Sequence, residues 1–256
     1  MTEPIPVHTT PSNKMIITMG LVASICGVLI VGAYESTQDA IANNKRIMVE
    51  RAVFKVLPGA AKVSEYVATP SGIQPLTGNV PEGGMKFYAA YDAAGALKGI
   101  AAEAAGKGYA DIVRVLYGYD TKCQCIIGIG VVSMRETPGI GDKIITDKEF
   151  LKNFDALDVR VNAEMSALAN AVKVVKHGTK QNAWEIDAIA GATVTTKAVG
   201  RGINESAQKL MPLLVPHIEQ LGKGEEGREK GKDLGASLSP PFPLLPLPFP
   251  QEGASA

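Results

Sequence analysis

The most continuous apolar stretch of the chain covers residues 15–34, close to the start of the sequence. It carries no charged residue, and its length is that of a helix that crosses the hydrocarbon core of a bilayer. A cleaved signal peptide is the alternative, but the run is long for one and no basic cluster precedes it. We therefore expect an uncleaved membrane helix there, after a short tail at residues 1–14. Lys14 before the run and Glu35 after it favour a cytoplasmic N-terminus, with the remainder of the chain outside the cytoplasm.

Beyond residue 35, apolar positions recur first at the helical period and then at the shorter period of strands. A second helix is predicted at residues 40–57, where Pro58-Gly59 ends it. The stretch that follows, up to residue 84, is rich in turn residues. Strands are then predicted at residues 85–92, 97–103, 112–119, 125–132, 172–176 and 183–187, the third and fourth as a hairpin around residues 120–122, with a loop at 106–109 and a short helix at 147–154.

A long helix is predicted from about Thr195 to Gln220, with Pro212 expected to kink it or end it early. Together these elements indicate the α+β class, with a mixed, mostly antiparallel domain over residues 35–221. Over residues 222–256 the composition changes to glycine and charge, and then to proline. Such a segment lacks the apolar content that folding requires, so we expect an extended, solvated tail. A docking segment for a partner is the alternative.

The composition and motif content of the sequence argue against several classes of function. Lys+Arg and Asp+Glu balance at 26 each, so no basic field indicates binding to nucleic acid. The sequence contains no zinc spacing, haem signature or Walker loop, and no metal site is predicted. Of the three cysteines, Cys26 lies in the apolar run, whereas Cys123 and Cys125 stand two residues apart. On a strand that spacing puts both side chains on one face, where they rarely form a disulfide, so we interpret them as structural or incidental.

Residues 187–196 read Asp-Ala-Ile-Ala-Gly-Ala-Thr-Val-Thr-Thr and lead into the long predicted helix. Gly191 and Ala192 have almost no side chain, so a bulky ligand can approach the backbone there. Thr193 then offers an acceptor hydroxyl, and Thr195 or Thr196 is predicted to cap the helix. A hydroxyl just ahead of a helix lies where N–H groups and the helix dipole favour a phosphate. An ordinary small-residue turn before a capped helix is the alternative.

This stretch is similar to a known motif. Asp187 to Thr193 resembles the Asp-x-x-(Ser/Thr)-Gly-Ala-Thr flavinylation motif of the FMN-binding domain family, with Ala190 where Ser or Thr is usual. The resemblance implies FMN joined to Thr193 through a phosphoester bond, which a dedicated flavin transferase makes from FAD. Asp187 is then expected to serve the attachment reaction, as a carboxylate close to phosphoryl transfer to a hydroxyl. A turn or cap residue is the alternative for Asp187.

A second motif lies at residues 135–143. Its core, Glu136 to Gly141, resembles the Glu-Thr-Pro-Gly-(Leu/Ile)-Gly signature of the branch of this family that holds the Rnf G subunits and the C subunits of sodium-translocating NADH:quinone reductases. Glycine lets the backbone N–H and C=O groups of such a loop approach a planar flavin ring. The resemblance implies that Glu136, Thr137, Ile140 and Gly141 lie near the ring. An ordinary Pro-Gly turn, with Glu136 as a solvated charge, is the alternative.

The resemblance covers roughly residues 14–220 and implies an electron-carrying subunit of an ion-translocating Rnf-type complex, rather than an independent enzyme. The implied partners are the other membrane and peripheral subunits, the flavin transferase and the lipid bilayer. The implied location is the bacterial inner membrane, crossed once, with the soluble domain on the periplasmic side. Three alternatives stay open: the C subunit of a sodium-translocating NADH:quinone reductase, a flavin domain serving another membrane reductase, and a membrane-anchored scaffold without cofactor.

Overall fold

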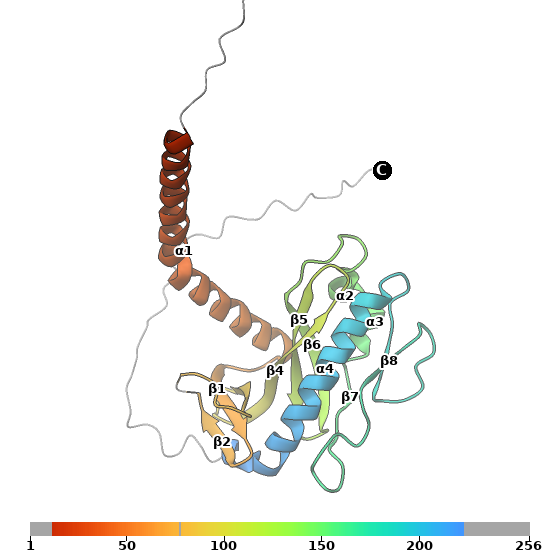
Figure 1. Ribbon diagram of the computed structural model, residues 1–256. Helices are drawn as coiled ribbons and strands as arrows, with labels where there is room; N and C mark the ends of the chain where they lie inside the picture. Colours follow the sequence, from red (N-terminus) through yellow and green to blue (C-terminus); the bar gives the residue numbers. More distant parts are fainter. Residues whose placement is uncertain (1–11, 77, 223–256) are drawn as a thin grey trace, which may run out of the picture. The chain divides into compact units, whose positions relative to one another are not determined.

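The computed structural model describes residues 12–76 and 78–222. The chain begins there with one long helix, α1, which covers Ser12–Val56 (Figure 1). Among the described residues α1 is the one helix long and apolar enough to cross a membrane, and none of its most apolar window is buried. The two helices predicted at residues 15–34 and 40–57 are therefore one. No proline or glycine stands between Glu35 and Val56, so nothing in the backbone chemistry interrupts the helical hydrogen bonds.

A seven-stranded antiparallel sheet follows, in the order β2-β1-β3-β4-β5-β6-β7. The expected α+β class with a mostly antiparallel sheet is confirmed. A separate pair, β8 and β9, is parallel. The strands are β1 Lys62–Thr69, β2 Gly72–Pro75, β3 Met85–Tyr91, β4 Leu97–Lys107, β5 Ile112–Asp120, β6 Cys125–Ser133, β7 Leu157–Asp158, β8 Lys173–Val175 and β9 Glu185–Asp187.

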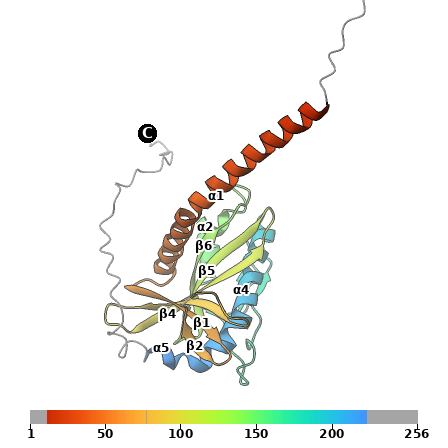
Figure 2. The same ribbon diagram turned by 60° about the vertical axis from the view of Figure 1, so that its left-hand side comes forward.

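A helix covers each face of this sheet (Figures 1 and 2). The last turns of α1 pack on one face and α4, Thr193–Leu214, packs on the other. Successive residues of the central strands therefore enter different cores: Ile100 and Tyr117 face α4, whereas their neighbours Ala101 and Leu116 face α1. Since side chains alternate along a strand, a sheet buried on both sides needs a nearly continuous apolar sequence, and β4 to β6 have one.

Helix α4 lies unusually close to β4. A Cβ atom on Gly106 of β4 would collide with the backbone carbonyl of Ala198, and one on Gly202 would meet the backbone of Ala105 at 2.8 Å. The helix is also tied to the sheet by polar groups, because the buried Ser206 hydroxyl donates to the carbonyl of Glu103 at 2.9 Å. These contacts fix the helix axis, and with it the position of the helix N-terminus.

Several predicted elements differ from the observed ones. The stretch expected to consist of turns contains β1 and β2, whose mixed polar and apolar residues suit an edge of the sheet. Strand β4 runs to Lys107, through half of the loop expected at 106–109. The short helix predicted at 147–154 is α3, Lys148–Lys152, preceded by α2, Lys143–Thr146. Helix α4 ends at Leu214, two residues after Pro212, and the chain continues as the 3-10 helix η1, Val215–His217, and α5, Glu219–Gly222.

The hairpin predicted around residues 120–122 is confirmed as β5 and β6. The tail expected at residues 222–256 lies, from residue 223 on, outside the described residues, as does most of the tail expected at 1–14.

Candidate functional site

The two sequence motifs meet at the N-terminus of α4. The Thr195 hydroxyl donates to Oε2 of Glu136 at 2.7 Å, across 59 residues of chain. Thr195 is buried, only 2% exposed, so its hydroxyl is committed to this bond. The loop that carries Glu136 therefore lies directly beside the first turn of the helix, two residues from Thr193.

Glu136 also holds a third segment, the turn between β4 and β5. Its two carboxylate oxygens accept from the backbone N–H groups of Tyr109, Ala110 and Asp111, at 3.3, 3.1 and 3.4 Å. We call this arrangement, Glu136 with Thr195 and the three N–H groups, the Glu136 clamp. Gly108 and Gly141 have no room for a Cβ atom, because the Glu136 side chain fills that space. The clamp thus joins three segments that are distant in the sequence.

The clamp holds the carboxyl of Glu136 in its charged form. Partial desolvation raises the pKa of Glu136, but the four hydrogen bonds of the clamp outweigh it, so the pKa lies below its usual range. A depressed pKa in the folded protein means that the clamp stabilises the fold above the unfolded pKa of about 4.3, and that this contribution is lost as the pH falls through the folded value.

We therefore expect Glu136→Gln to lower the melting temperature at pH 7 and to lower it progressively less as the pH falls below about 4, where the wild-type carboxyl also becomes neutral. Melting curves of both proteins between pH 3 and pH 7 measure this difference. Glu205→Gln, on the exposed side of α4, is the matched control and is expected to show no such convergence. A wild-type-to-Glu136→Gln gap that stays constant with pH would contradict the prediction.

Thr193 is the first residue of α4 and is exposed. Gly191, two residues earlier, has a φ of +84°, a conformation that favours glycine, and only open space lies where its Cβ would be. Ala192 is the N-cap residue and is buried. The turn therefore presents the Thr193 hydroxyl to solvent beside the free N–H groups of a 22-residue helix, where an anion is favoured.

The prediction that Thr195 or Thr196 caps the helix is wrong. The helix begins at Thr193, and the side chain of the N-cap residue makes no capping bond. Thr196 is fully buried and its hydroxyl donates back to the carbonyl of Ala192 at 3.0 Å, while Thr195 serves the clamp. The N-cap position is instead taken by Ala192, which has no side-chain acceptor, and the sequence spacing did not show this.

The other residues of the second motif form the turn that supports Glu136. The carbonyl of Thr137 accepts from the N–H groups of Ile140 and Gly141 at 3.2 and 2.9 Å. Thr137 and Ile140 are exposed, and Gly141 is buried against the Glu136 side chain. The loop is therefore fixed by Glu136 while its apolar side chain at Ile140 faces outward.

Asp187 ends β9 and belongs to a separate polar cluster. Its Oδ2 atom accepts from the N–H of Gly178 at 2.9 Å and lies 3.6 Å from Nδ1 of His177. Its backbone N–H donates to Oδ1 of Asn153 at 3.0 Å, and the same oxygen accepts from Nζ of Lys180. Oδ1 of Asp187 is buried without a hydrogen-bond partner among the described residues. Burial lowers the pKa of Lys180, against the attraction of Asp187.

An open groove of about 420 Å³ runs between β8 and the first turns of α4. Its lining combines valine side chains with cationic ones: Val172, Lys173, Val174, Val194, Lys197, Gly200 and Arg201. The Arg201 guanidinium is held by the carbonyls of Lys197 and Lys107, at 3.3 and 3.2 Å. The groove therefore offers apolar surface and positive charge within two turns of Thr193.

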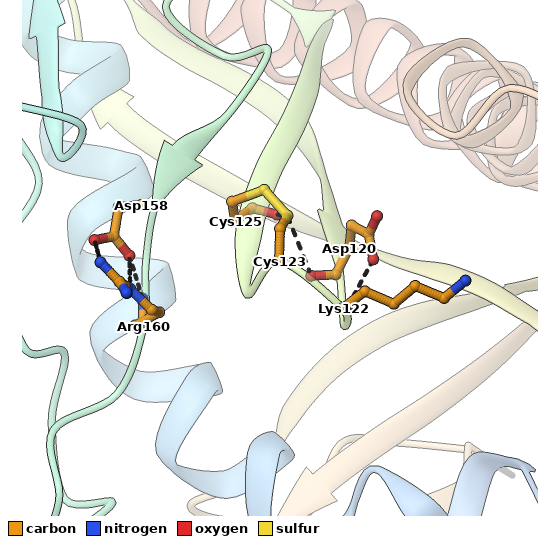
Figure 3. Close-up of a disulfide and its surroundings, with 6 residues drawn as sticks. All are labelled: Asp120, Lys122, Cys123, Cys125, Asp158 and Arg160. Carbon is orange, nitrogen blue, oxygen red and sulfur yellow. Dashed lines mark hydrogen bonds and ion pairs between the residues drawn. A yellow bond between two sulfur atoms is a disulfide. The ribbon is translucent and has the colours of Figure 1, made fainter.

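Cys123 and Cys125 form a disulfide at the tip of the β5–β6 hairpin (Figure 3). The expectation that this spacing leaves them unbonded is wrong. It assumed that both residues lie on a strand, but β6 begins at Cys125 and Cys123 lies in the turn. Gln124 between them has a φ of 53°, and this left-handed residue bends the chain so that the two sulfur atoms meet.

Sequence reasoning missed two parts of this site. The N–H groups of residues 109–111 are backbone donors, and no side-chain pattern indicates them. Lys197 and Arg201 stand one and two turns after Thr193, and this spacing of cations along one helix face was a signal available in the sequence.

Comparison with known proteins shows what this region is similar to. Residues 108–208 match the FMN-binding domain family, a region that contains the clamp, the disulfide and the first turns of α4. Residues 108–208 therefore have the sequence features of an FMN-binding domain. Over most of its length it is similar to the G subunits of ion-translocating oxidoreductase complexes.

With the G subunit of Methanosarcina acetivorans the chain is 27% identical over 191 residues, which are 73% of this chain and 88% of the relative. With that of Pasteurella multocida it is 26% identical over 202 residues, 77% of this chain and 93% of the relative. A shorter match, 38% over 103 residues, joins 40% of the chain to 43% of the G subunit of the Na(+)-translocating ferredoxin:NAD(+) oxidoreductase complex of Acetobacterium woodii.

Two solved structures share the fold. The C subunit of the Na(+)-translocating NADH-quinone reductase of Parabacteroides distasonis has a TM-score of 0.53 at 17% identity, covering 69% of this chain and 96% of that one. Shewanella oneidensis NqrC has a TM-score of 0.50 at 18% identity, covering 72% and 99%.

Proposed function

We propose that this chain is the electron-carrying flavoprotein subunit of a membrane-bound, ion-translocating Rnf-type complex, with FMN attached to Thr193 through a phosphoester. The Thr195–Glu136 hydrogen bond supports this proposal most strongly. It joins the two motifs of the resemblance beside one exposed hydroxyl. The similarity to G subunits along most of the chain favours this complex over the quinone reductase, whose C subunit is the nearest alternative.

The residues around Thr193 suit a phosphate and a planar ring. The N-terminus of α4 and the cations Lys197 and Arg201 favour the phosphate, and Val194 gives apolar surface beside them. Tyr109 and Ile140 add exposed apolar side chains, on segments held by the Glu136 clamp. When bound, FMN supplies the redox chemistry, and the protein holds it and tunes its potential.

We assign the roles implied by the resemblance, which are flavin attachment, support of the ring-facing loop and assistance of attachment, to Thr193, Glu136 and Asp187. Thr193 offers its hydroxyl to the flavin transferase, since it is exposed whereas Thr195 and Thr196 are buried. The Glu136 clamp keeps the ring-facing loop of residues 137–141 in place. Asp187 serves attachment through its partly exposed carboxylate, which in this structure is bonded to the N–H of Gly178.

We further propose that α1 crosses the bacterial inner membrane over residues 15–34 and places the domain on the periplasmic side. There the domain meets the other members of its complex, and the transferase acts on it after export. The apolar, unburied first half of α1 supports the membrane span, and the charges that flank it support the orientation.

The decisive experiment is the absorbance spectrum of the full-length protein, purified in detergent after co-expression with a flavin transferase. We expect flavin bands that remain with the chain after denaturation and removal of small molecules. Bands that disappear on denaturation would support a flavoprotein but contradict the covalent bond. A chain that never shows flavin bands would favour the anchored scaffold without cofactor.

A further inference from the structure

The disulfide at the hairpin tip has no part in the flavin site. It closes a ring across a single residue, Gln124, which is held in the left-handed region that residues with a side chain seldom occupy. Reduction would remove the covalent restraint on Gln124. The bond is therefore local to this turn, which joins two strands held together by the β5–β6 ladder.

The two cysteines differ in accessibility. Cys123 lies exposed in the turn, whereas Cys125 is buried, 6% exposed, at the start of β6. In Figure 3, Asp158 of β7, which accepts from the guanidinium of Arg160 at 2.7 and 2.9 Å, lies on the same side of the disulfide as Cys125. Cys125 is also the ladder partner of Asp158. An approaching molecule therefore reaches the sulfur of Cys123 first.

The turn accommodates the reduced form as well. Sγ of Cys123 lies 3.8 Å from the carbonyl oxygen of Asp120 and 3.9 Å from that of Cys125. A thiol is a weak donor, and after reduction the S–H of Cys123 has these two oxygens as acceptors. The hairpin is kept in register by the β5–β6 ladder, which does not depend on the disulfide. Both redox states thus fit the same hairpin.

We propose that Cys123–Cys125 is a thiol–disulfide exchange site whose substrate is a dithiol protein of the Cys-x-x-Cys type. One thiolate of the partner attacks Sγ of Cys123, forming a mixed disulfide and breaking the Cys123–Cys125 bond. The sulfur of Cys125 leaves and takes up the proton that the attacking thiol lost. The partner's second thiolate then attacks the sulfur of the partner's first cysteine in the mixed disulfide and releases Cys123 as a thiol. Two electrons and two protons pass to this chain, and the partner becomes a disulfide; oxidation follows the same steps in reverse.

This site is distant from the proposed flavin. The Glu136 clamp holds the turn before Ile112, at one end of β5, and the disulfide follows Asp120 at the other end. Eight steps along a strand span about 26 Å. A partner docked at the hairpin tip therefore leaves the N-terminus of α4 untouched, and the exchange chemistry can be tested without any cofactor.

The test uses full-length protein in detergent, in a Cys26→Ala background that removes the third thiol. The oxidised protein is mixed, without denaturant, with a thioredoxin in which the second cysteine of the Cys-x-x-Cys pair is serine. After acid quenching, peptide mass spectrometry locates the mixed disulfide. We expect it on Cys123, with at least tenfold less on Cys125. Intact thioredoxin is expected to reduce the pair fully, read as two maleimide labels per chain.

A second measurement tests the proposal only in variants that are shown to fold. The single-cysteine proteins Cys125→Ser and Cys123→Ser, with folding checked by circular dichroism, are reacted with an aromatic disulfide reagent. The thiol of Cys123 is expected to react at least tenfold faster than that of Cys125. Reduction only in denaturant, equal trapping on both cysteines, or equal thiol reactivity would each overturn the proposal.

Discussion

Replacing Thr193 by alanine is expected to remove all covalently bound flavin while the domain stays folded. Thr193 is exposed and lies at the first position of α4, so its side chain contributes little to packing. Thr195 and Thr196 cannot substitute for it, because they are 2% and 0% exposed and their hydroxyls are bonded to Glu136 and to the carbonyl of Ala192. Mass spectrometry of the peptide that spans residues 183–197, after co-expression with the flavin transferase, measures the loss.

Four variants make this result specific. Thr193→Ser retains a hydroxyl and is expected to retain flavin. Thr195→Val and Thr196→Val are expected to keep the flavin on Thr193, with stability lowered by about 1 kcal/mol each for the lost hydrogen bond. Asp187→Ala is expected to impair attachment without removing the acceptor. An FMN-sized mass on Thr195 or Thr196 would show that the attachment site is not Thr193. If neither the wild type nor any variant carried such a mass, the covalent bond would be contradicted.

Gly106→Ala is expected to destabilise the domain by about 3 kcal/mol or to prevent its folding. The new methyl group would collide with the carbonyl of Ala198, which is backbone and cannot turn aside as a side chain can. Helix α4 would have to move away from β4, and Thr195 would be drawn away from Glu136. Urea denaturation followed by circular dichroism measures the loss.

Gly128→Ala is the matched control for this prediction. Gly128 also lies in a central strand, but the nearest atom to its Cβ would be the carbonyl oxygen of Val56 at 3.4 Å, an ordinary contact. We expect it to change the free energy of unfolding by less than about 1 kcal/mol. Equal losses in Gly106→Ala and Gly128→Ala would show that glycine in these strands matters for flexibility rather than for the approach of α4.

The elements with strong periodic signals were predictable, and those decided by distant contacts were not. The β5–β6 hairpin and α4 were recognisable because apolar residues recur there at the right period between turn residues. Strand β1 was missed because its polar residues, such as Lys62 and Glu65, suit an edge strand as well as a loop. Its pairing with β2 and β3 makes it a strand.

The site was predictable as motifs but not as an arrangement. Sequence indicated Glu136 and Thr193 separately, by resemblance. It could not show that Thr195 connects them, because that hydrogen bond depends on how α4 crosses the sheet. The disulfide was mispredicted for the same reason, since the left-handed conformation of Gln124 leaves no trace in residue type.

The unbroken α1 constrains how this protein can move. A flexible linker between a helix and a domain lets the two move independently over a wide range. Here about 33 Å of continuous helix follows residue 34, and its last turns, with Val53 and Val56, are built into the core of the domain. Among the described residues no flexible linker separates the first half of α1 from the domain, so a rotation or displacement of that half is transmitted to the domain and is not absorbed by a loop.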